Sequence, residues 1–204
     1  MYKLSVPINI HTIDEENIGS WIEILRRCEV QRVFVCFGGY VCDDSLDVYK
    51  NPEKLKWAID IFRENDFEVA FWLNTLGHGG ILAHEQEKDK QTVEYTQMAG
   101  VMGEISEPAY CPLDEKFSGK FCYALKLFAS MNPDIIMLDD DFRLNLRSYY
   151  FGCFCDLHLA KYYERIGEEI PREKLEELIF TGGKNKYRTE FMRLSAETLL
   201  DFSK

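Results

Sequence analysis

Four short apolar segments alternate with stretches of helical periodicity, and this alternation limits the fold more than any other feature of the chain. The segments span residues 4–10, 32–37, 68–73 and 134–138, and each ends in polar or small residues. Continuous apolar strands between amphipathic helices are typical of parallel βα units whose sheet is covered on both faces. The sequence therefore predicts an α/β fold.

Local signals mark where the helices begin and end. Residues 12–15 fit a capping box, and Asn51 and Pro52 supply an N-cap and a first-turn proline for a second helix. A third helix is expected over 118–131, because Pro133 then stops it. After the fourth strand, helices are expected over 156–166 with Gly167 as the end signal, from Pro171, and from 186 to the C-terminus.

No fifth strand is expected after residue 138, whereas a (β/α)8 barrel takes about 250 residues. We therefore expect a TIM-barrel type in which this chain supplies about the first four βα units. Residues 1–204 would form a single barrel domain, incomplete at its C-terminus, which a second copy or a missing half would complete. The segment 77–112 is a long connection of the kind that carries function in barrels.

The charge of the chain excludes some partners. With 35 acidic and 24 basic residues the net charge is -11, so a nucleic-acid backbone would be repelled. The N-terminus has no signal-peptide pattern and no apolar run reaches membrane-spanning length, which predicts a cytoplasmic protein without a membrane partner. Seven cysteines favour free thiols or metal ligands over disulfides, with Cys28, Cys36 and Cys122 expected to pack in the core.

Three consecutive carboxylates, Asp139, Asp140 and Asp141, close the fourth apolar segment. In a parallel α/β fold this end of the strand faces the ligand. Mutual repulsion favours a proton on one carboxyl group, as general acid catalysis requires, and Arg143 can moderate that repulsion. The alternative is a solvated acidic loop that caps the next helix or binds a divalent cation.

A cysteine and histidine group follows downstream. Cys153, Cys155 and His158 have a C-x-C-x-x-H spacing, and Cys111 in the long connection is the best candidate for a fourth ligand. Four such ligands predict a closed, structural zinc site. His78 and His84 are rival ligands or substrate contacts, and the alternative is a set of reduced thiols beside a surface histidine.

Taken together, the acidic cluster, the C-x-C-x-x-H spacing and Tyr110-Cys111-Pro112 resemble glycoside hydrolase family 42, the (β/α)8 β-galactosidases, over residues 111–165. The resemblance implies that Asp141 is the general acid/base and that Asp140 contacts the sugar 2-hydroxyl. It also implies a structural zinc at the cysteine and histidine group. Aspartates replace the family's glutamate and asparagine, His158 replaces a cysteine, the opening motif is absent, and the strand-seven nucleophile lies outside this chain.

Two other functions remain open from the sequence. Some N-acetylhexosaminidases place an adjacent aspartate pair at the end of strand four, and Asp140 with Asp141 is similar to that pair. The second alternative is a non-catalytic carbohydrate- or partner-binding module with a structural zinc. Four further residues are candidate sugar contacts, and the alternative for Trp72 is packing in the core: Asn74, Trp72, Tyr40 and Arg143.

Overall fold

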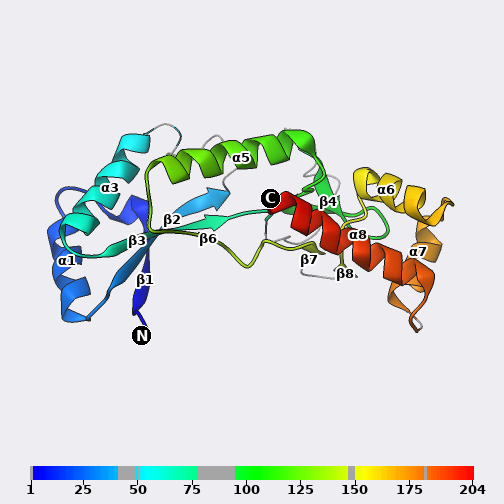
Figure 1. The fold of residues 1–204 in the computed structure, drawn as a ribbon, viewed down its shortest axis with the longest axis horizontal. Coiled ribbons are helices and arrows are strands. Elements are labelled where there is room, and N and C mark those ends of the chain that lie inside the picture. Colours follow the sequence, from blue (N-terminus) through cyan, green and yellow to red (C-terminus); the bar gives the residue numbers. More distant parts are fainter. Residues whose placement is uncertain (1, 41–48, 50, 78–94, 147–149, 182) are drawn as a thin grey trace. The chain divides into compact units, whose positions relative to one another are not determined.

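A computed structural model describes residues 2–40, 49, 51–77, 95–146, 150–181 and 183–204 of the chain (Figure 1). The chain divides into two compact units. The first unit comprises Met1–Thr75 and Phe121–Asp140, and the second comprises Leu76–Lys120 and Asp141–Lys204. Each unit is described by itself below.

The first unit contains a four-stranded parallel sheet with the order β1-β2-β3-β6 (Figure 1). Its strands are β1 (Ser5–Asn9), β2 (Arg32–Tyr40), β3 (Glu68–Asn74) and β6 (Ile135–Leu138). The four predicted apolar segments are these strands, so the prediction of an α/β fold with a parallel sheet is confirmed. The valines of β2 and β3 and Phe71 are buried, as expected for strands inside a covered sheet, whereas Phe34, Phe37 and Trp72 are partly buried.

Helices of the first unit follow the amphipathic pattern of their sequences. In α3 (Pro52–Glu64) the Asn51 side chain accepts a hydrogen bond from the Lys54 N–H, and the helix packs on β3 through buried apolar residues.

The prediction that residues 12–15 form a capping box at the start of α1 (Ile18–Arg27) is wrong. A 3-10 turn occupies Ile10–Thr12, and α1 begins only after Asn17. The reason is that the Asn9 side chain and the Asp14 side chain cap local turns before the helix starts.

One long helix, α5 (Glu115–Ser130), has residues in both units. In the first unit its Phe128 ring packs on Phe71 of β3 and stacks on Phe37 of β2, at centroid distances of 5.5 and 5.2 Å. Aromatic pairs at these distances add to the hydrophobic stabilisation of a core. The sheet is therefore held against α5 by rings from two of its strands.

The second unit contains two short antiparallel hairpins that the sequence pattern did not indicate. They are formed by β4 (Gln97–Ala99) with β5 (Ile105–Tyr110) and by β7 (Asn145–Leu146) with β8 (Tyr150–Phe151). The first hairpin lies within the predicted long connection, and the second follows the position after which no strand was expected. β4, β7 and β8 have only two or three residues, and the six residues of β5 include polar residues and a proline, so none of these strands gives an apolar run in the sequence.

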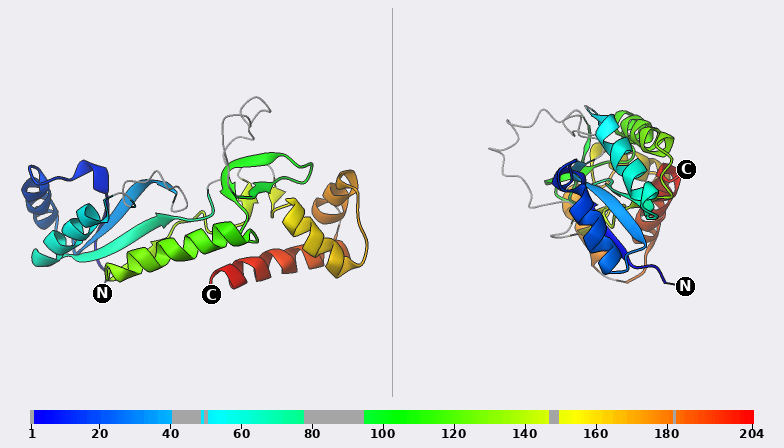
Figure 2. Two further views of the ribbon diagram at one scale, coloured as in Figure 1. Left: turned by 90° about the horizontal axis from the view of Figure 1, so that it is seen from above. Right: turned by 90° about the vertical axis from the view of Figure 1, so that its left-hand side faces the viewer.

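Three helices complete the second unit, and they form one group in Figure 2. Helices α6 (Asp156–Ile166) and α7 (Arg172–Phe180) both contact α8 (Lys186–Phe202). The predicted end signal of α6 is confirmed, because Gly167 has a left-handed φ of 76°. Among the described helices, none combines the length and the apolar character that crossing a membrane requires.

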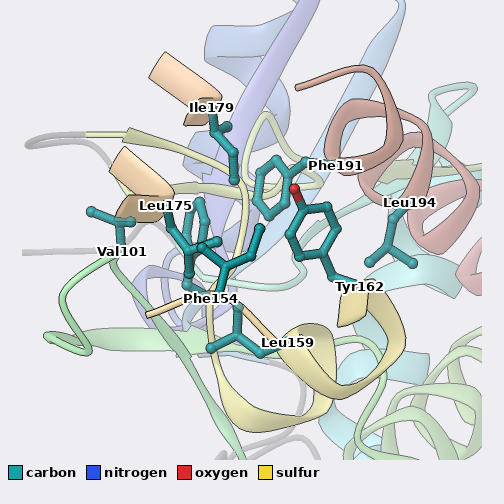
Figure 3. Close-up of a cluster of buried hydrophobic side chains, with 9 residues drawn as sticks. Val101, Phe154, Leu159, Tyr162, Leu175, Ile179, Phe191 and Leu194 are labelled. Carbon is teal, nitrogen blue, oxygen red and sulfur yellow. The ribbon is translucent and has the colours of Figure 1, made fainter. Parts of the chain in front are cut away.

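The core of these three helices is built around aromatic rings (Figure 3). Phe154, which precedes α6, stacks on Phe191 of α8 with ring centroids 4.4 Å apart and planes at 16°. The ring of Tyr162 meets the Phe191 ring edge-on, and its hydroxyl donates to the Tyr187 carbonyl. Phe191 therefore lies between the segment before α6 and α6 itself.

The described cysteines divide into two groups. Cys28 and Cys122 are exposed and Cys36 is partly exposed, so the prediction that these three pack in the core is wrong. Cys28 is the C-cap of α1, and Cys122 lies on an exposed position of α5. Cys111, Cys153 and Cys155 are all buried free thiols in the second unit. Cys42 lies outside the described residues.

Candidate functional site

The carboxyl end of β6 places two of the three predicted catalytic aspartates at the surface of the first unit. Asp139 is partly buried, and its N–H donates to the Leu73 carbonyl of β3 at 2.9 Å. Asp140 is exposed, and its N–H donates to Asp139 Oδ1 at 2.7 Å. The Asp139 carboxylate is therefore tied to its own loop, while Asp140 reaches solvent.

Two predicted sugar contacts lie on the neighbouring strand of the same sheet. Asn74 is the last residue of β3 and is partly buried. Trp72, also partly buried, pairs in register with Met137 of β6. Tyr40 ends β2 in register with Asn74, but its side chain is outside the described part of the chain. Asn74 thus shares the carboxyl edge of this sheet with Asp139 and Asp140, as the parallel topology predicts.

Asp141 has a different environment, in the second unit. Its side chain is fully buried, and Oδ2 accepts a hydrogen bond of 3.0 Å from the Gly77 N–H. Gly77 has a backbone φ of 109°, a conformation that residues other than glycine rarely adopt. The Arg143 N–H donates to the Asp141 carbonyl at 2.8 Å, and the Arg143 side chain is partly buried. Sequence reasoning missed this role of Gly77, although its place in a glycine-rich segment was a signal.

Four buried metal-ligand side chains meet in the second unit. One potential ligand atom from each lies within 4.8 Å of the others, and the group consists of Cys111, Cys153, Cys155 and His158. Cys111 follows β5, Cys153 and Cys155 lie between β8 and α6, and His158 is in the first turn of α6. The structure therefore brings together the four residues that the sequence predicts as ligands. We call them the Cys3His cluster.

Backbone hydrogen bonds hold Cys111 in place. Its N–H donates to the Thr96 carbonyl at 2.8 Å, and its carbonyl accepts from the Asp114 N–H at 3.0 Å. The Asp114 carboxylate in turn accepts from the Thr96 N–H at 2.7 Å and from the Phe117 N–H in the first turn of α5. These bonds connect the position of Cys111 to the start of α5.

The segment that carries Cys153 and Cys155 is fixed by packing. Gly152 has a φ of 101°, and a Cβ atom there would lie 2.4 Å from the ring of Phe191. Phe154 turns into the helical core while its two cysteine neighbours turn to the cluster. The spacing C-x-C thus allows one residue to pack while both thiols face the same point.

Burial and mutual hydrogen bonding set the charge of the thiols. Hydrogen bonding to Cys153 and Cys155, together with burial, raises the pKa of Cys111. Burial raises the pKa of Cys153. Hydrogen bonds from Cys111 and Cys153, with a further one from His158, lower the pKa of Cys155. A metal cation that binds the three sulfurs would displace the thiol protons.

The donor set fits a metal ion. Three sulfurs and one imidazole nitrogen are the ligands of closed tetrahedral zinc sites, and thiolates select soft or borderline metals over magnesium or calcium. A buried Cys3His group of this kind can bind a metal. His78 and His84, the rival ligands from the sequence, lie outside the described residues.

Comparison with known proteins gives a result for structure only. No protein-family model matches the sequence, and no curated protein matches it. Solved structures that resemble the chain include the β-galactosidase of the psychrophilic Marinomonas ef1, with 13% identity and a TM-score of 0.63. The β-galactosidases of the Antarctic haloarchaeon Halorubrum lacusprofundi and of Bacillus circulans sp. alkalophilus are each 12% identical, with TM-scores of 0.60 and 0.55.

The match extends over almost the whole chain but over a small part of each neighbour. It covers 98% of this chain and 34%, 33% and 33% of the three β-galactosidases. The chain therefore spans about a third of the length of these enzymes. The likeness shows an α/β fold similar to part of a β-galactosidase.

Proposed function

We propose that this chain is a glycoside hydrolase-like protein of the family 42 type that acts on a β-galactoside-like bond. The observation that carries the proposal is the match of 98% of the chain to three β-galactosidases. The resemblance of the strand-four and cysteine motifs to the same type of enzyme supports it independently. On this proposal residues 1–204 are about the first four βα units of a (β/α)8 barrel domain.

Asp141 is the proton donor in this proposal, as the resemblance implies. The Gly77 N–H fixes one carboxylate oxygen of Asp141, which supports a defined orientation of that group. General acid catalysis needs a carboxyl group held in place relative to the glycosidic oxygen. In the first unit, Asp140 and Asn74 supply polar atoms for sugar hydroxyls at the carboxyl edge of the sheet, with Asp139 beside them.

Zinc is the metal that we propose for the Cys3His cluster. Its role is structural, because four protein ligands leave no open coordination position for a substrate. The cluster joins the end of β5, the segment after β8 and the first turn of α6. Metal binding would therefore stabilise the second unit rather than take part in hydrolysis.

The decisive experiment compares hydrolysis of aryl glycosides by the wild type and by Asp141→Asn, each assayed in a complete barrel that supplies the strand-seven nucleophile. An asparagine carbonyl can still accept the Gly77 N–H, so the variant should fold, but it cannot donate the proton. We expect hydrolysis of an aryl β-galactoside by the wild type and a loss of kcat of about 100-fold or more in the variant. Asp60→Asn, an exposed change on α3, is the matched control and should keep full activity.

Three other outcomes would contradict the proposed mechanism or the proposed function. Full activity in Asp141→Asn would remove this residue from the mechanism. A wild type that prefers N-acetylhexosaminides to galactosides would replace the proposal by the hexosaminidase alternative. A wild type that binds galactosides in titration calorimetry but turns none over would make the chain a carbohydrate-binding module.

A further inference from the structure

The imidazole of His158 presents one particular nitrogen to the thiols of the Cys3His cluster. Its Nδ1 lies 3.2 Å from Cys111 Sγ and 3.6 Å from Cys155 Sγ. The second nitrogen, Nε2, is buried and has no hydrogen-bond partner among the residues that the structure describes. The two nitrogens of this ring are therefore in distinct environments.

We propose that His158 binds the metal through Nδ1, while Nε2 keeps its proton and stays buried without an acceptor among the described residues. The inference rests on the metal site proposed above and assigns the binding atom within it. It concerns a position where this chain departs from the four-cysteine pattern that its sequence resembles. The proposal explains how histidine can replace cysteine there without displacing the other ligands.

The distances favour Nδ1. With zinc–sulfur bonds of about 2.3 Å and zinc–nitrogen bonds of about 2.0 Å, tetrahedral angles place sulfur and nitrogen ligands about 3.5 Å apart. The two Nδ1 to Sγ distances, 3.2 and 3.6 Å, lie within a few tenths of an ångström of this value. Binding through Nδ1 therefore needs only a small adjustment of the ring.

The length of the side chain supports the same atom. Nδ1 is one bond closer to Cβ than Nε2 is, so it occupies a place more similar to that of a cysteine sulfur. The longer zinc–sulfur bond offsets part of the remaining difference in reach. A cysteine at position 158, in the first turn of α6, should therefore reach the metal without movement of the helix.

The unpartnered Nε2 has a consequence for affinity. Metal-binding histidines nearly always donate their other N–H to a carboxylate, carbonyl or water, and loss of such a partner weakens metal binding by about 10–100-fold. Among the described residues, His158 lacks this support. A fourth thiolate would need no such partner and would add a negative charge, so His158→Cys should bind zinc at least as tightly as the wild type.

Nitrogen NMR of the zinc-loaded wild-type chain tests the assignment directly. Long-range proton–nitrogen spectra distinguish a metal-bound ring nitrogen from a protonated one, and the chain has only 4 histidines. We expect a protonated Nε2 and a metal-bound Nδ1 for the ring whose signals disappear in His158→Cys. A protonated Nδ1, or a His158 ring that zinc does not change, would overturn the inference.

Two substitutions give a second readout by competition with a chelator. His158→Cys should keep zinc with an affinity equal to or above that of the wild type. His158→Gln places its oxygen near the position of Nε2 and should weaken zinc binding about 100-fold or more. The reverse order would overturn the assignment of Nδ1. A wild type that takes up no zinc would instead refute the metal site itself, so the two failures are distinguishable.

Discussion

The three aspartates and the Cys3His cluster differ in how sequence distance relates to position in the fold. Asp139, Asp140 and Asp141 are consecutive, yet the first two belong to one compact unit and the third to the other. Their exposure runs from partly buried through exposed to fully buried. The ligands of the Cys3His cluster come from segments up to 47 residues apart and converge within 4.8 Å.

This difference shows which kind of motif is the safer guide to a site. A run of like charges at the end of a strand has no attraction to hold it together, so each carboxylate takes its own partners. Thiols and an imidazole can share protons or one metal ion, and their mutual contacts keep the cluster together. Substitutions in the cluster should therefore have larger effects on stability than substitutions among the aspartates.

Cys153→Ser gives the largest expected effect. Cys153 is fully buried and serine is a poor zinc ligand, so we expect metal binding to weaken on the order of 1000-fold, which is about 4 kcal/mol. For a chain of this size that loss lowers the Tm by about 8–16 °C. Elemental analysis should find about one zinc per chain in the wild type and none in the variant.

The matched control for this prediction is Cys122→Ser. Cys122 is an exposed thiol on α5, so its substitution should leave both zinc content and Tm within the error of measurement. Equal Tm values for Cys153→Ser and Cys122→Ser would contradict a structural metal. The cluster would then be no more important to stability than the aspartates.

Gly152→Ala should have the next largest effect, because it acts on the same cluster through packing. The residue has a left-handed φ, and the added Cβ would lie 2.4 Å from the Phe191 ring. Backbone strain and the displaced ring together should cost about 3 kcal/mol and lower the Tm by about 6–12 °C. Thermal unfolding followed by near-UV circular dichroism measures this.

Gly119→Ala is the control for the glycine prediction. Gly119 lies in α5 with open space around its Cα, so alanine should raise stability by about 0.5–1 kcal/mol through helix propensity. If Gly152→Ala is tolerated as well as Gly119→Ala, the close packing of Phe191 does not fix the segment that carries Cys153 and Cys155.

The sequence predicted some features of the fold and of the candidate site, and it missed others. Parallel strands and the Cys3His cluster were predictable because apolar runs and ligand spacing each reflect one dominant force. The hairpin of β4 and β5 was not, since neither strand forms an apolar run in the sequence and backbone pairing holds them together. The hydrogen bond between Gly77 and Asp141 joins residues 64 positions apart. Its donor is a backbone N–H, which every residue except proline has, so the residue types do not predict it.

Asp114→Asn should give the smallest effect and one that depends on pH. Burial alone would raise the pKa of Asp114, but hydrogen bonds from the N–H groups of Thr96 and Phe117 more than offset it and hold the pKa below the ordinary 3.8. Such a carboxylate stabilises the fold above its unfolded pKa, and that contribution is lost as pH falls through the lower folded value. The charge and the bond to Thr96 support the segment around Cys111, although partial exposure screens the charge.

At neutral pH we therefore expect Asp114→Asn to be less stable than the wild type by about 0.5–1 kcal/mol. The difference should begin to shrink below about pH 4, where the unfolded wild type takes up a proton at this position, and it should be lost as pH falls through the lower folded pKa. Denaturant unfolding at pH 7 and at pH 3 measures it, with Asp140→Asn as an exposed control that changes stability at pH 7 by less than about 0.5 kcal/mol. An equal difference in unfolding free energy between the wild type and Asp114→Asn at both pH values would show that Asp114 acts through the shape of its side chain and not through its charge. A gap no larger than that of Asp140→Asn would show that the aspartate beside the cluster is no more important to the fold than one at the exposed strand end.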